Sequence, residues 1–245
     1  MNQRPILIQG AMEAEISLYK EELEDMQEKE IHGYIFYEGK LDGYPIVLSK
    51  TNVGVINVTA STTIGIINYN PCIVINQGVA GGITRDIHKG DLVIGTTCIN
   101  INSYQTPILK KGEGSNSLNW ELKTFKEGID ELVELKADEE LIKTVKDNSD
   151  LYKYGKVYTG IIGSGDVWNS EIDKLEWLDK NYNIICEDME TIGTYQICNQ
   201  FKIPVIGMRT ISDNIVLEES YDKTVGLECQ KFCIEICKKI IKERK

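Results

Sequence analysis

The sequence predicts a three-layer α/β/α sandwich around a central mixed sheet, formed by a single domain over residues 1–245. Short apolar runs typical of buried strands alternate with longer segments of helical period, and this alternation is characteristic of α/β proteins. In addition, 245 residues with 42% hydrophobic and 27% charged side chains suit one α/β domain with a large core. The sequence contains no internal repeat or linker that indicates a second domain.

The first part of the chain predicts a strand, a helix and a hairpin. Residues 6–9 form a short apolar run, and residues 12–26 carry apolar side chains at helical spacing. Residues 34–37 and 46–49 are strand-like, and the turn residues Asp42–Gly43 lie between them. We therefore expect the last two segments to pair.

The next part predicts a helix between buried strands. Residues 55–69 are small and apolar and end before Pro71, which favours a helix that stops there. Residues 72–76 (CIVIN) are typical of a buried strand, and the glycine-rich residues 78–82 after them predict a loop. Residues 92–100 predict another strand.

The middle of the chain begins with a long polar excursion. Residues 102–137 show little periodicity, which predicts a surface loop, and long loops are often functional. Order returns with a predicted helix at 139–147, a strand at 156–162, a loop at 163–169 and a helix at 171–180.

The last part continues the alternation to the end of the chain. A short strand is predicted at 184–186, a helix at 189–200 and a strand at 204–209. A loop at 212–221 then leads to an amphipathic helix from residue 223 to the C-terminus.

Charge and hydropathy exclude several classes of protein. The net charge of −11, from 27 basic and 38 acidic residues, repels phosphate backbones, so we expect no nucleic-acid partner. No run of 18 apolar residues is present, so we expect no membrane span. The N-terminal residues lack a basic stretch followed by a long apolar segment, which predicts no signal peptide and a cytoplasmic location.

The seven cysteines include no CxxC pair. Cys229, Cys233 and Cys237 repeat every four residues along one face of the last helix. A metal site there would lack a fourth ligand, and cysteine often behaves as a small hydrophobic core residue. We therefore expect reduced, buried thiols and no metal.

Carboxylates follow four of five predicted strand ends, where ligands bind in open α/β sheets. Carboxylates without a catalytic histidine or cysteine indicate acid/base chemistry rather than acyl transfer. His32 and His88 lie in or beside predicted turns, so we expect them to be solvated, and the chain has neither a Walker A motif nor GxGxxG. The five strand-end segments are Gly10–Glu15, Gly78–Gly82, Ser164–Trp168, Glu187–Glu190 and Arg209–Asn214.

Six segments in order resemble the motif series of the 5′-methylthioadenosine/S-adenosylhomocysteine nucleosidases, in the nucleoside phosphorylase superfamily. Their order and spacing match over almost the whole chain, whereas any one of them alone would be weak. The resemblance implies a nucleoside phosphorylase-like fold. The segments are GAMEAE at residues 10–15, NQGVAGG at 76–82, GDLV at 90–93, SGD at 164–166, DME at 188–190 and RTISD at 209–213.

The resemblance implies dissociative cleavage of an N-ribosidic bond, with no cofactor. Glu15 matches the base that activates water, and Asp213 matches the acid that protonates the leaving purine, held by Ser212. Glu190 matches the carboxylate that grips the ribose hydroxyls, with Met189 packed under the ribose. Anions near a sugar that gains positive charge stabilise it. The resemblance also places Val79, Ala80, Gly81, Trp168, Asn169 and Asp188 at the substrate.

Each catalytic residue also has a structural interpretation. Glu15 is favoured by the dipole in the first turn of a helix, Asp213 can cap a turn or helix, and Glu190 can be a solvated helix residue. Only the motif series as a whole favours the functional interpretation.

Three features depart from the family pattern. The family usually has Phe followed by Ile or Val where this chain has Trp168 and Asn169; Trp168 can still stack on a purine, but Asn169 weakens the expectation of strict adenine preference. Asn169 is alternatively a helix cap. Val79 replaces a common serine, and the unusual segment 112–126 is expected to reshape the 5′ side of the pocket.

A purine nucleoside phosphorylase is the nearest alternative. Phosphate binding there depends on arginines around the first and third strand ends, where this chain has Glu15 and no arginine. A carboxylate repels phosphate but activates water, which favours hydrolysis. We expect Arg85 to be a solvated turn residue and Arg209 a structural ion-pair partner.

Two further alternatives concern the substrate. A futalosine-type nucleosidase would share the same carboxylates, whereas a non-catalytic binder would be expected to have lost them. The family resemblance implies a small-molecule nucleoside ligand and a homodimer whose partner completes the 5′ pocket. Tyr104 is a candidate for the partner's contribution, and Tyr221 is a candidate within the chain.

Overall fold

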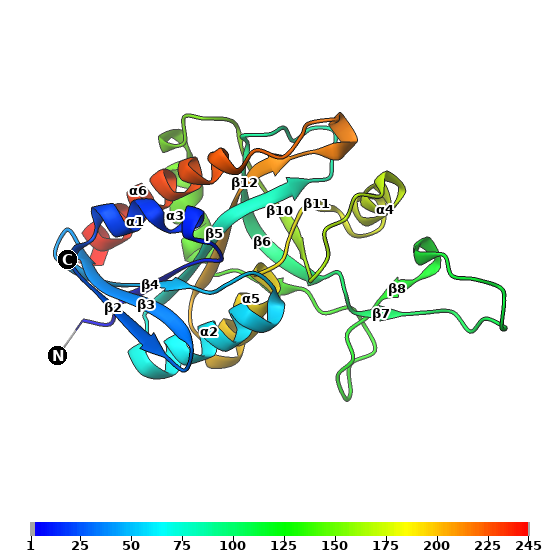
Figure 1. The fold of residues 1–245 in the computed structure, drawn as a ribbon, viewed down its shortest axis with the longest axis horizontal. Coiled ribbons are helices and arrows are strands. Elements are labelled where there is room, and N and C mark those ends of the chain that lie inside the picture. Colours follow the sequence, from blue (N-terminus) through cyan, green and yellow to red (C-terminus); the bar gives the residue numbers. More distant parts are fainter. Residues whose placement is uncertain (1–2, 245) are drawn as a thin grey trace.

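The computed structural model describes residues 3–244 and has a mixed sheet with helices on both faces (Figure 1). The strand order is β11-β10-β6-β12-β5-β1-β4-β3-β2, and β9 pairs with β6. The strands of this sheet are β1 (Ile6–Gly10), β2 (Glu24–Ile31), β3 (Tyr34–Leu41), β4 (Tyr44–Lys50), β5 (Ile73–Gly82), β6 (Leu92–Asn100), β9 (Leu135–Lys136), β10 (Val157–Ser164), β11 (Ile184–Asp188) and β12 (Val205–Asp213). The α-helices are α1 (Ser17–Glu22), α2 (Val55–Tyr69), α3 (Glu139–Asp147), α4 (Ile172–Tyr182), α5 (Thr191–Phe201) and α6 (Gly226–Arg244).

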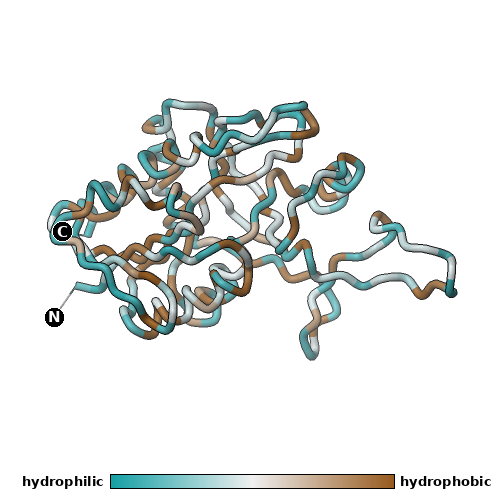
Figure 2. Tube along the Cα trace, viewed as in Figure 1, coloured by the Kyte–Doolittle hydropathy of each residue, from teal (hydrophilic) through white to brown (hydrophobic). Residues whose placement is uncertain are grey.

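The core lies in two layers because successive side chains of a strand point to opposite faces. In β1, Ile6 and Ile8 pack with α1, α3 and α6, whereas Leu7 packs with α2 and α5. Hydrophobic segments accordingly concentrate along the central strands (Figure 2). The sheet and the helices on its two faces form the predicted three-layer fold, which is confirmed.

One edge of the sheet curls back onto its centre. Strand β11 runs parallel to β10 but also pairs antiparallel with the end of β5, through Cys186 with Gly82 and Glu187 with Gly81. On the other side of β5, Asp213 of β12 lies in register with Gly81. This closure brings the ends of β5, β11 and β12 to one place, where the candidate site forms.

The predicted helix over residues 12–26 is wrong. The chain instead forms a short 3-10 turn at Glu13–Glu15, the six-residue helix α1, and strand β2 from Glu24. Strand β2 is an edge strand with mostly exposed charged side chains. Charges protect edges from unwanted pairing, and here they hide the strand from a hydrophobicity pattern.

The predicted loop at residues 78–82 is also wrong. Strand β5 continues through Gly82, because its backbone pairs with β12 on one side and β11 on the other. Strand β12 likewise extends beyond the predicted residue 209 as far as Asp213. Pairing on both sides therefore overrides the low strand preference of glycine.

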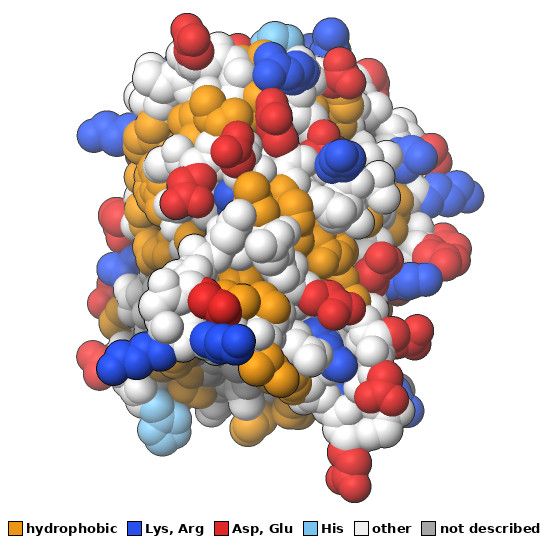
Figure 3. All heavy atoms as spheres, turned by 90° about the vertical axis from the view of Figure 1, so that its right-hand side faces the viewer, with side chains coloured by type: hydrophobic (Ala, Val, Ile, Leu, Met, Phe, Trp, Pro, Cys, Tyr) orange, Lys and Arg blue, Asp and Glu red, His pale blue; other side chains and the backbone are white. Residues whose placement is uncertain are grey.

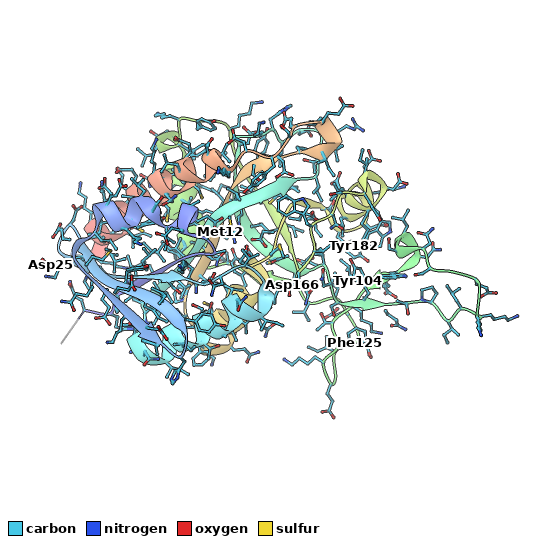
Figure 4. All side chains as sticks on the ribbon, in the orientation of Figure 1. Met12, Asp25, Tyr104, Phe125, Asp166 and Tyr182 are labelled. Carbon is cyan, nitrogen blue, oxygen red and sulfur yellow. The ribbon has the colours of Figure 1, made fainter. Side chains whose placement is uncertain are left out.

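Most of the excursion at residues 102–137 projects from the body as an arm (Figure 1). It contains the two-stranded sheet β7 (Tyr104–Gln105) and β8 (Glu121–Leu122). Figure 4 shows Tyr104 and Phe125 on this excursion, to the right of Met12 and Asp166 in this view.

The remaining observations concern the surface and the thiols. Acidic and basic side chains intermingle with hydrophobic ones on the face shown in Figure 3. Among residues 3–244, no helix is long and apolar enough to cross a membrane. Cys229, Cys233 and Cys237 lie on the buried face of α6 and are fully buried, as predicted.

Candidate active site

A pocket opens where the ends of β1, β5, β11 and β12 meet the loop before α4. The structure brings every residue predicted for the site to this pocket. Tyr221, the candidate within the chain, also lines it, and the residues not predicted are Ala11, Met12, Val53, Val167 and Glu187. The lining residues are Ala11, Met12, Glu15, Val53, Val79, Ala80, Gly81, Val167, Trp168, Asn169, Glu187, Asp188, Met189, Glu190, Ser212, Asp213 and Tyr221.

Glu15 is a buried carboxylate held by backbone N–H groups. Its Oε2 accepts hydrogen bonds from Ala11 (2.7 Å) and Met12 (3.1 Å), and its Oε1 accepts one from Val79 (3.1 Å). The carboxylate occupies the space that a Cβ on Gly78 would need, which explains the glycine at that position. Burial raises the pKa of Glu15, although Arg209 and the backbone donors oppose this effect. Glu15 is therefore a fixed base with an increased affinity for a proton.

A buried ion pair lies beneath the pocket. Arg209 Nε donates to Asp188 Oδ2 at 2.6 Å, and the guanidinium also bonds Asn76 and Thr191. The other oxygen, Asp188 Oδ1, accepts from the backbone N–H groups of Thr191 and Glu190. With both oxygens engaged, Asp188 positions the segment that carries Glu190. Arg209 is the structural ion-pair partner that we predicted.

Glu190 approaches the pocket from the start of α5. Its Oε1 accepts a hydrogen bond from Gly54 N–H at 3.0 Å, which ties it to the loop before α2. Burial, reinforced by the neighbouring carboxylate of Asp188, raises the pKa of Glu190 to about 8. Met189 lines the same wall. A carboxylate kept this basic can accept strong hydrogen bonds from hydroxyl groups of a ligand.

Asp213 lies across the pocket mouth, at the end of β12. Ser212 Oγ donates to Asp213 Oδ1 at 2.7 Å, the bond that the motif resemblance implied. Partial burial raises the pKa of Asp213, opposed by this hydrogen bond and by Lys89. The arrangement favours a carboxyl group that can hold a proton and deliver it.

Two aromatic rings stand at the open side of the pocket. Trp168 and Tyr221 meet edge to face with their centroids 5.6 Å apart. Trp168 remains 65% exposed, so a broad ring face is available to a planar ligand. Tyr221, the candidate within the chain, also lines the pocket.

Asn169 does not cap α4, so that interpretation is wrong; the cap position belongs to Glu171. Instead the Asn169 backbone N–H bonds Glu187 Oε1 at 3.2 Å, and its side-chain Nδ2 bonds Glu187 Oε2 at 2.6 Å. Burial raises the pKa of Glu187 to about 7. Sequence reasoning missed Glu187 as a site residue, although it stood in a strand-end carboxylate cluster.

Asp166 of the SGD segment was likewise given no role. Its Oδ1 accepts a hydrogen bond from Val55 N–H at 2.7 Å, at the start of α2. A carboxylate is favourable at the positive end of a helix. Asp166 thereby fixes the loop around Val53, which forms one wall of the pocket.

The segment 112–126 contributes no residue to the pocket wall of its own chain, contrary to our expectation. Tyr104 packs edge-on against Trp120 within the excursion, at a centroid distance of 5.2 Å. Arg85 is exposed and pairs with Glu176, as expected for a solvated turn residue. His88 is also exposed, and its Nδ1 lies 2.9 Å from Glu219.

Comparisons with known sequences support the motif resemblance. The sequence model of the phosphorylase superfamily matches residues 5–242. A 5′-methylthioadenosine/S-adenosylhomocysteine nucleosidase from Geobacillus sp. (strain WCH70) is 29% identical over 209 residues, covering 85% of this chain and 84% of that protein. A protein of the same name from Bacillus anthracis (strain A0248) is 27% identical over 251 residues, covering 96% and 99%. The resemblance drawn from six short motifs is confirmed.

Solved structures share the fold. A nucleosidase of the same name from Neisseria meningitidis, in complex with methylthio-immucillin-A, has a TM-score of 0.80 at 24% identity and covers 97% of this chain and 100% of that one. A futalosine hydrolase mutant from Helicobacter pylori has a TM-score of 0.77 at 20% identity, covering 98% and 100%. At these identities the likeness establishes the fold and leaves the substrate open.

Proposed function

This chain belongs to the phosphorylase superfamily, and from that premise we propose that it hydrolyses the N-ribosidic bond of 5′-methylthioadenosine or S-adenosylhomocysteine and releases adenine. One observation carries the proposal: three carboxyl groups, Glu15, Glu190 and Asp213, converge on a pocket whose described wall contains no lysine, arginine or histidine. The names of the sequence relatives support nucleoside hydrolysis.

Glu15 is proposed to orient and deprotonate the attacking water. Its two oxygens accept three backbone hydrogen bonds, and Oε1, which accepts only one of them, still has capacity for a further donor. The carboxylate is therefore fixed in place before the substrate binds. Burial raises the pKa of Glu15, which makes its carboxylate a stronger base for this step.

Glu190 is proposed to hold the ribose hydroxyls while the sugar gains positive charge. The negative charge of its ionised form stabilises an oxocarbenium-like transition state more than the neutral ground state, which is the requirement for catalysis. Met189, beside it, is proposed to pack under the ribose, and Asp188 with Arg209 fixes the segment beneath.

Asp213 is proposed to protonate the purine at N7 so that the base leaves as a neutral molecule. Burial raises its pKa and favours the protonated form that this step needs. Trp168 is proposed to stack on the base across the open side of the pocket. Residues 79–81, which line the pocket, are proposed to let the substrate approach their backbone closely.

Hydrolysis is favoured over phosphorolysis by the charge of the pocket. Phosphate is an anion that normally requires Arg, Lys or backbone N–H donors. Arg209 is engaged by Asp188, and the Val79 N–H already bonds Glu15. A phosphate ion next to Glu15 would be repelled, whereas a water molecule there would be activated.

The experiment is an assay of adenine release from 5′-methylthioadenosine, with and without phosphate, in which the sugar product is identified. Free methylthioribose formed without phosphate supports the proposal. Methylthioribose 1-phosphate formed only with phosphate would make the protein a phosphorylase and contradict the role of Glu15.

The assembly and location are also proposals. The family resemblance leads us to propose a cytoplasmic homodimer that needs no cofactor. Sedimentation of the purified protein tests the dimer, and a monomer with full activity would contradict a contribution of the partner to the 5′ pocket.

A further inference from the structure

Glu187 and Asp213 flank the same small space at the base side of the pocket. Gly81 of β5 is in register with Glu187 on one side and with Asp213 on the other. A Cβ at Gly81 would lie 3.7 Å from Asp213 Oδ2 and 3.8 Å from Glu187 Cγ. Because Gly81 has no side chain, the Asp213 carboxyl group and the Glu187 side chain both border the space above it.

Asn169 holds Glu187 but leaves it able to accept more hydrogen bonds. Among residues 3–244, the recorded hydrogen bonds to this carboxyl group come from Asn169 alone, one to each oxygen. A carboxylate has about four acceptor positions, so part of its capacity is unused. Glu187 lines the pocket, and a buried acceptor without a partner is unfavourable. The site therefore calls for a ligand with N–H groups at this position.

We propose that Glu187 reads the edge of the six-membered ring of the base, and that the site accepts 6-oxopurine nucleosides at least as well as adenine nucleosides. This inference rests on the proposed N-ribosidic hydrolysis and changes only the base. A 6-oxopurine carries a hydrogen on N1, and this N–H group can donate a hydrogen bond to a carboxylate. Adenine presents an unprotonated N1, whose lone pair would face the carboxylate oxygen.

The orientation of the base follows from the position of Asp213. Along one edge of a purine, N7 is followed by the substituent on C6 and then by N1. If Asp213 delivers its proton to N7, this edge faces Asp213 and its neighbours. Glu187, beside Asp213 across Gly81, is the next carboxyl group along that edge. Trp168 can stack on the base without distinguishing oxo from amino groups.

The charge of Glu187 in the reactive state supports the acceptance of 6-oxopurine nucleosides. Burial, with smaller contributions from the charges of Asp213 and Asp188, raises its pKa to about 7 against the opposing hydrogen bonds from Asn169. The Asp188 charge is paired with Arg209. When Asp213 carries the proton it must donate, its repulsion of Glu187 disappears, and Glu187 ionises more readily.

The test uses 5′-methylthioadenosine and 5′-methylthioinosine, which share the sugar and differ in the base edge. We expect a kcat/KM for the inosine compound at least equal to that for the adenosine compound. We expect Glu187→Gln to lower the ratio of kcat/KM for the inosine compound to kcat/KM for the adenosine compound by at least about tenfold. This factor corresponds to the loss of one charged hydrogen bond. Gln has one carbonyl oxygen for the two Asn169 donors, so its NH₂ group can no longer accept a hydrogen bond from N1–H.

Two further variants sharpen the test. Asn169→Ala is expected to shift the ratio in the same direction, because Asn169 positions Glu187. Glu176→Gln, which removes an exposed carboxylate on α4, is expected to leave the ratio unchanged. A wild-type preference for the adenosine compound, or equal losses for both substrates in Glu187→Gln, would overturn the inference while hydrolysis stands.

Binding of free bases separates this inference from the proposed function. By calorimetry, hypoxanthine is expected to bind the wild type at least tenfold more tightly than it binds Glu187→Gln. If neither nucleoside is hydrolysed, the proposed function fails, and this difference in binding still decides the role of Glu187. Equal affinity of both proteins for hypoxanthine would contradict it.

Discussion

The half of the pocket that we propose binds the sugar and the half that we propose binds the base are built differently. The sugar half, around Glu15 and Glu190, is largely buried, and its carboxylates are fixed by backbone N–H groups and by the Arg209–Asp188 pair below. The base half, around Asp213 and Trp168, lies at strand ends and on a loop, and Trp168 is 65% exposed. The rigid half suits stabilisation of a charged transition state, and the open half suits selection and release of the base.

The largest effects are expected from the residues that we propose as general base and general acid. Glu15→Gln and Asp213→Asn are each expected to reduce kcat by roughly 10²–10⁴-fold, the usual contribution of a general base or acid. Circular dichroism and thermal unfolding should show an intact fold. Full activity in both variants would remove the roles assigned here.

A matched pair of Asp→Asn changes contrasts the two halves in stability. Asp188→Asn leaves the buried Arg209 without its counter-ion and is expected to reduce the free energy of unfolding by roughly 3–5 kcal/mol. Asp213→Asn, at the open half, is expected to change it much less. Denaturant unfolding measures both, and equal losses would contradict the proposed difference between the halves.

A dependence of stability on pH should come from both halves. Burial raises the pKa of Glu190 to about 8 and that of Glu187 to about 7, above the value near 4.5 of an unfolded glutamate. The folded state therefore binds more protons, and these groups lower stability as the pH rises from about 4.5 to about 8. Glu190→Gln is expected to flatten this decline more than Glu187→Gln in unfolding curves measured at several pH values. An unchanged decline in both variants would argue against the raised pKa values.

The smallest effect is expected at the exposed ring. Trp168→Ala is expected to raise the KM about fivefold or more with little change in kcat, because base stacking contributes roughly 1–3 kcal/mol. Trp168→Phe, which keeps an aromatic face, should recover most of the loss. An unchanged KM in Trp168→Ala would count against stacking.

Sequence analysis identified Glu15 and Glu190 in the sugar half and Asp213 and Trp168 in the base half, but it missed Glu187. Glu15 and Glu190 stand at strand ends within motifs, so their convergence follows from the topology of α/β sheets. The bond between Asn169 and Glu187 depends on β11 folding back onto β5, and such closure leaves no local pattern in the chain.

In the fold as well, the sequence predicts elements with a local pattern and misses those that depend on tertiary pairing. Helix α2 has the bounds that its apolar run and the following Pro71 predicted. Strand β2 was missed because its side chains are charged and exposed at a sheet edge, and the glycines of β5 were taken for a loop because their pairing on both sides is a tertiary effect.

The most direct test of the account uses water labelled with oxygen-18 and excess unlabelled phosphate. The wild type and Glu15→Gln are compared with 5′-methylthioadenosine as substrate, and the sugar product is quenched early and analysed by mass spectrometry. The account predicts labelled free methylthioribose from the wild type and a strongly reduced rate of labelling in Glu15→Gln. A sugar phosphate without the label would contradict attack by a water molecule that Glu15 activates.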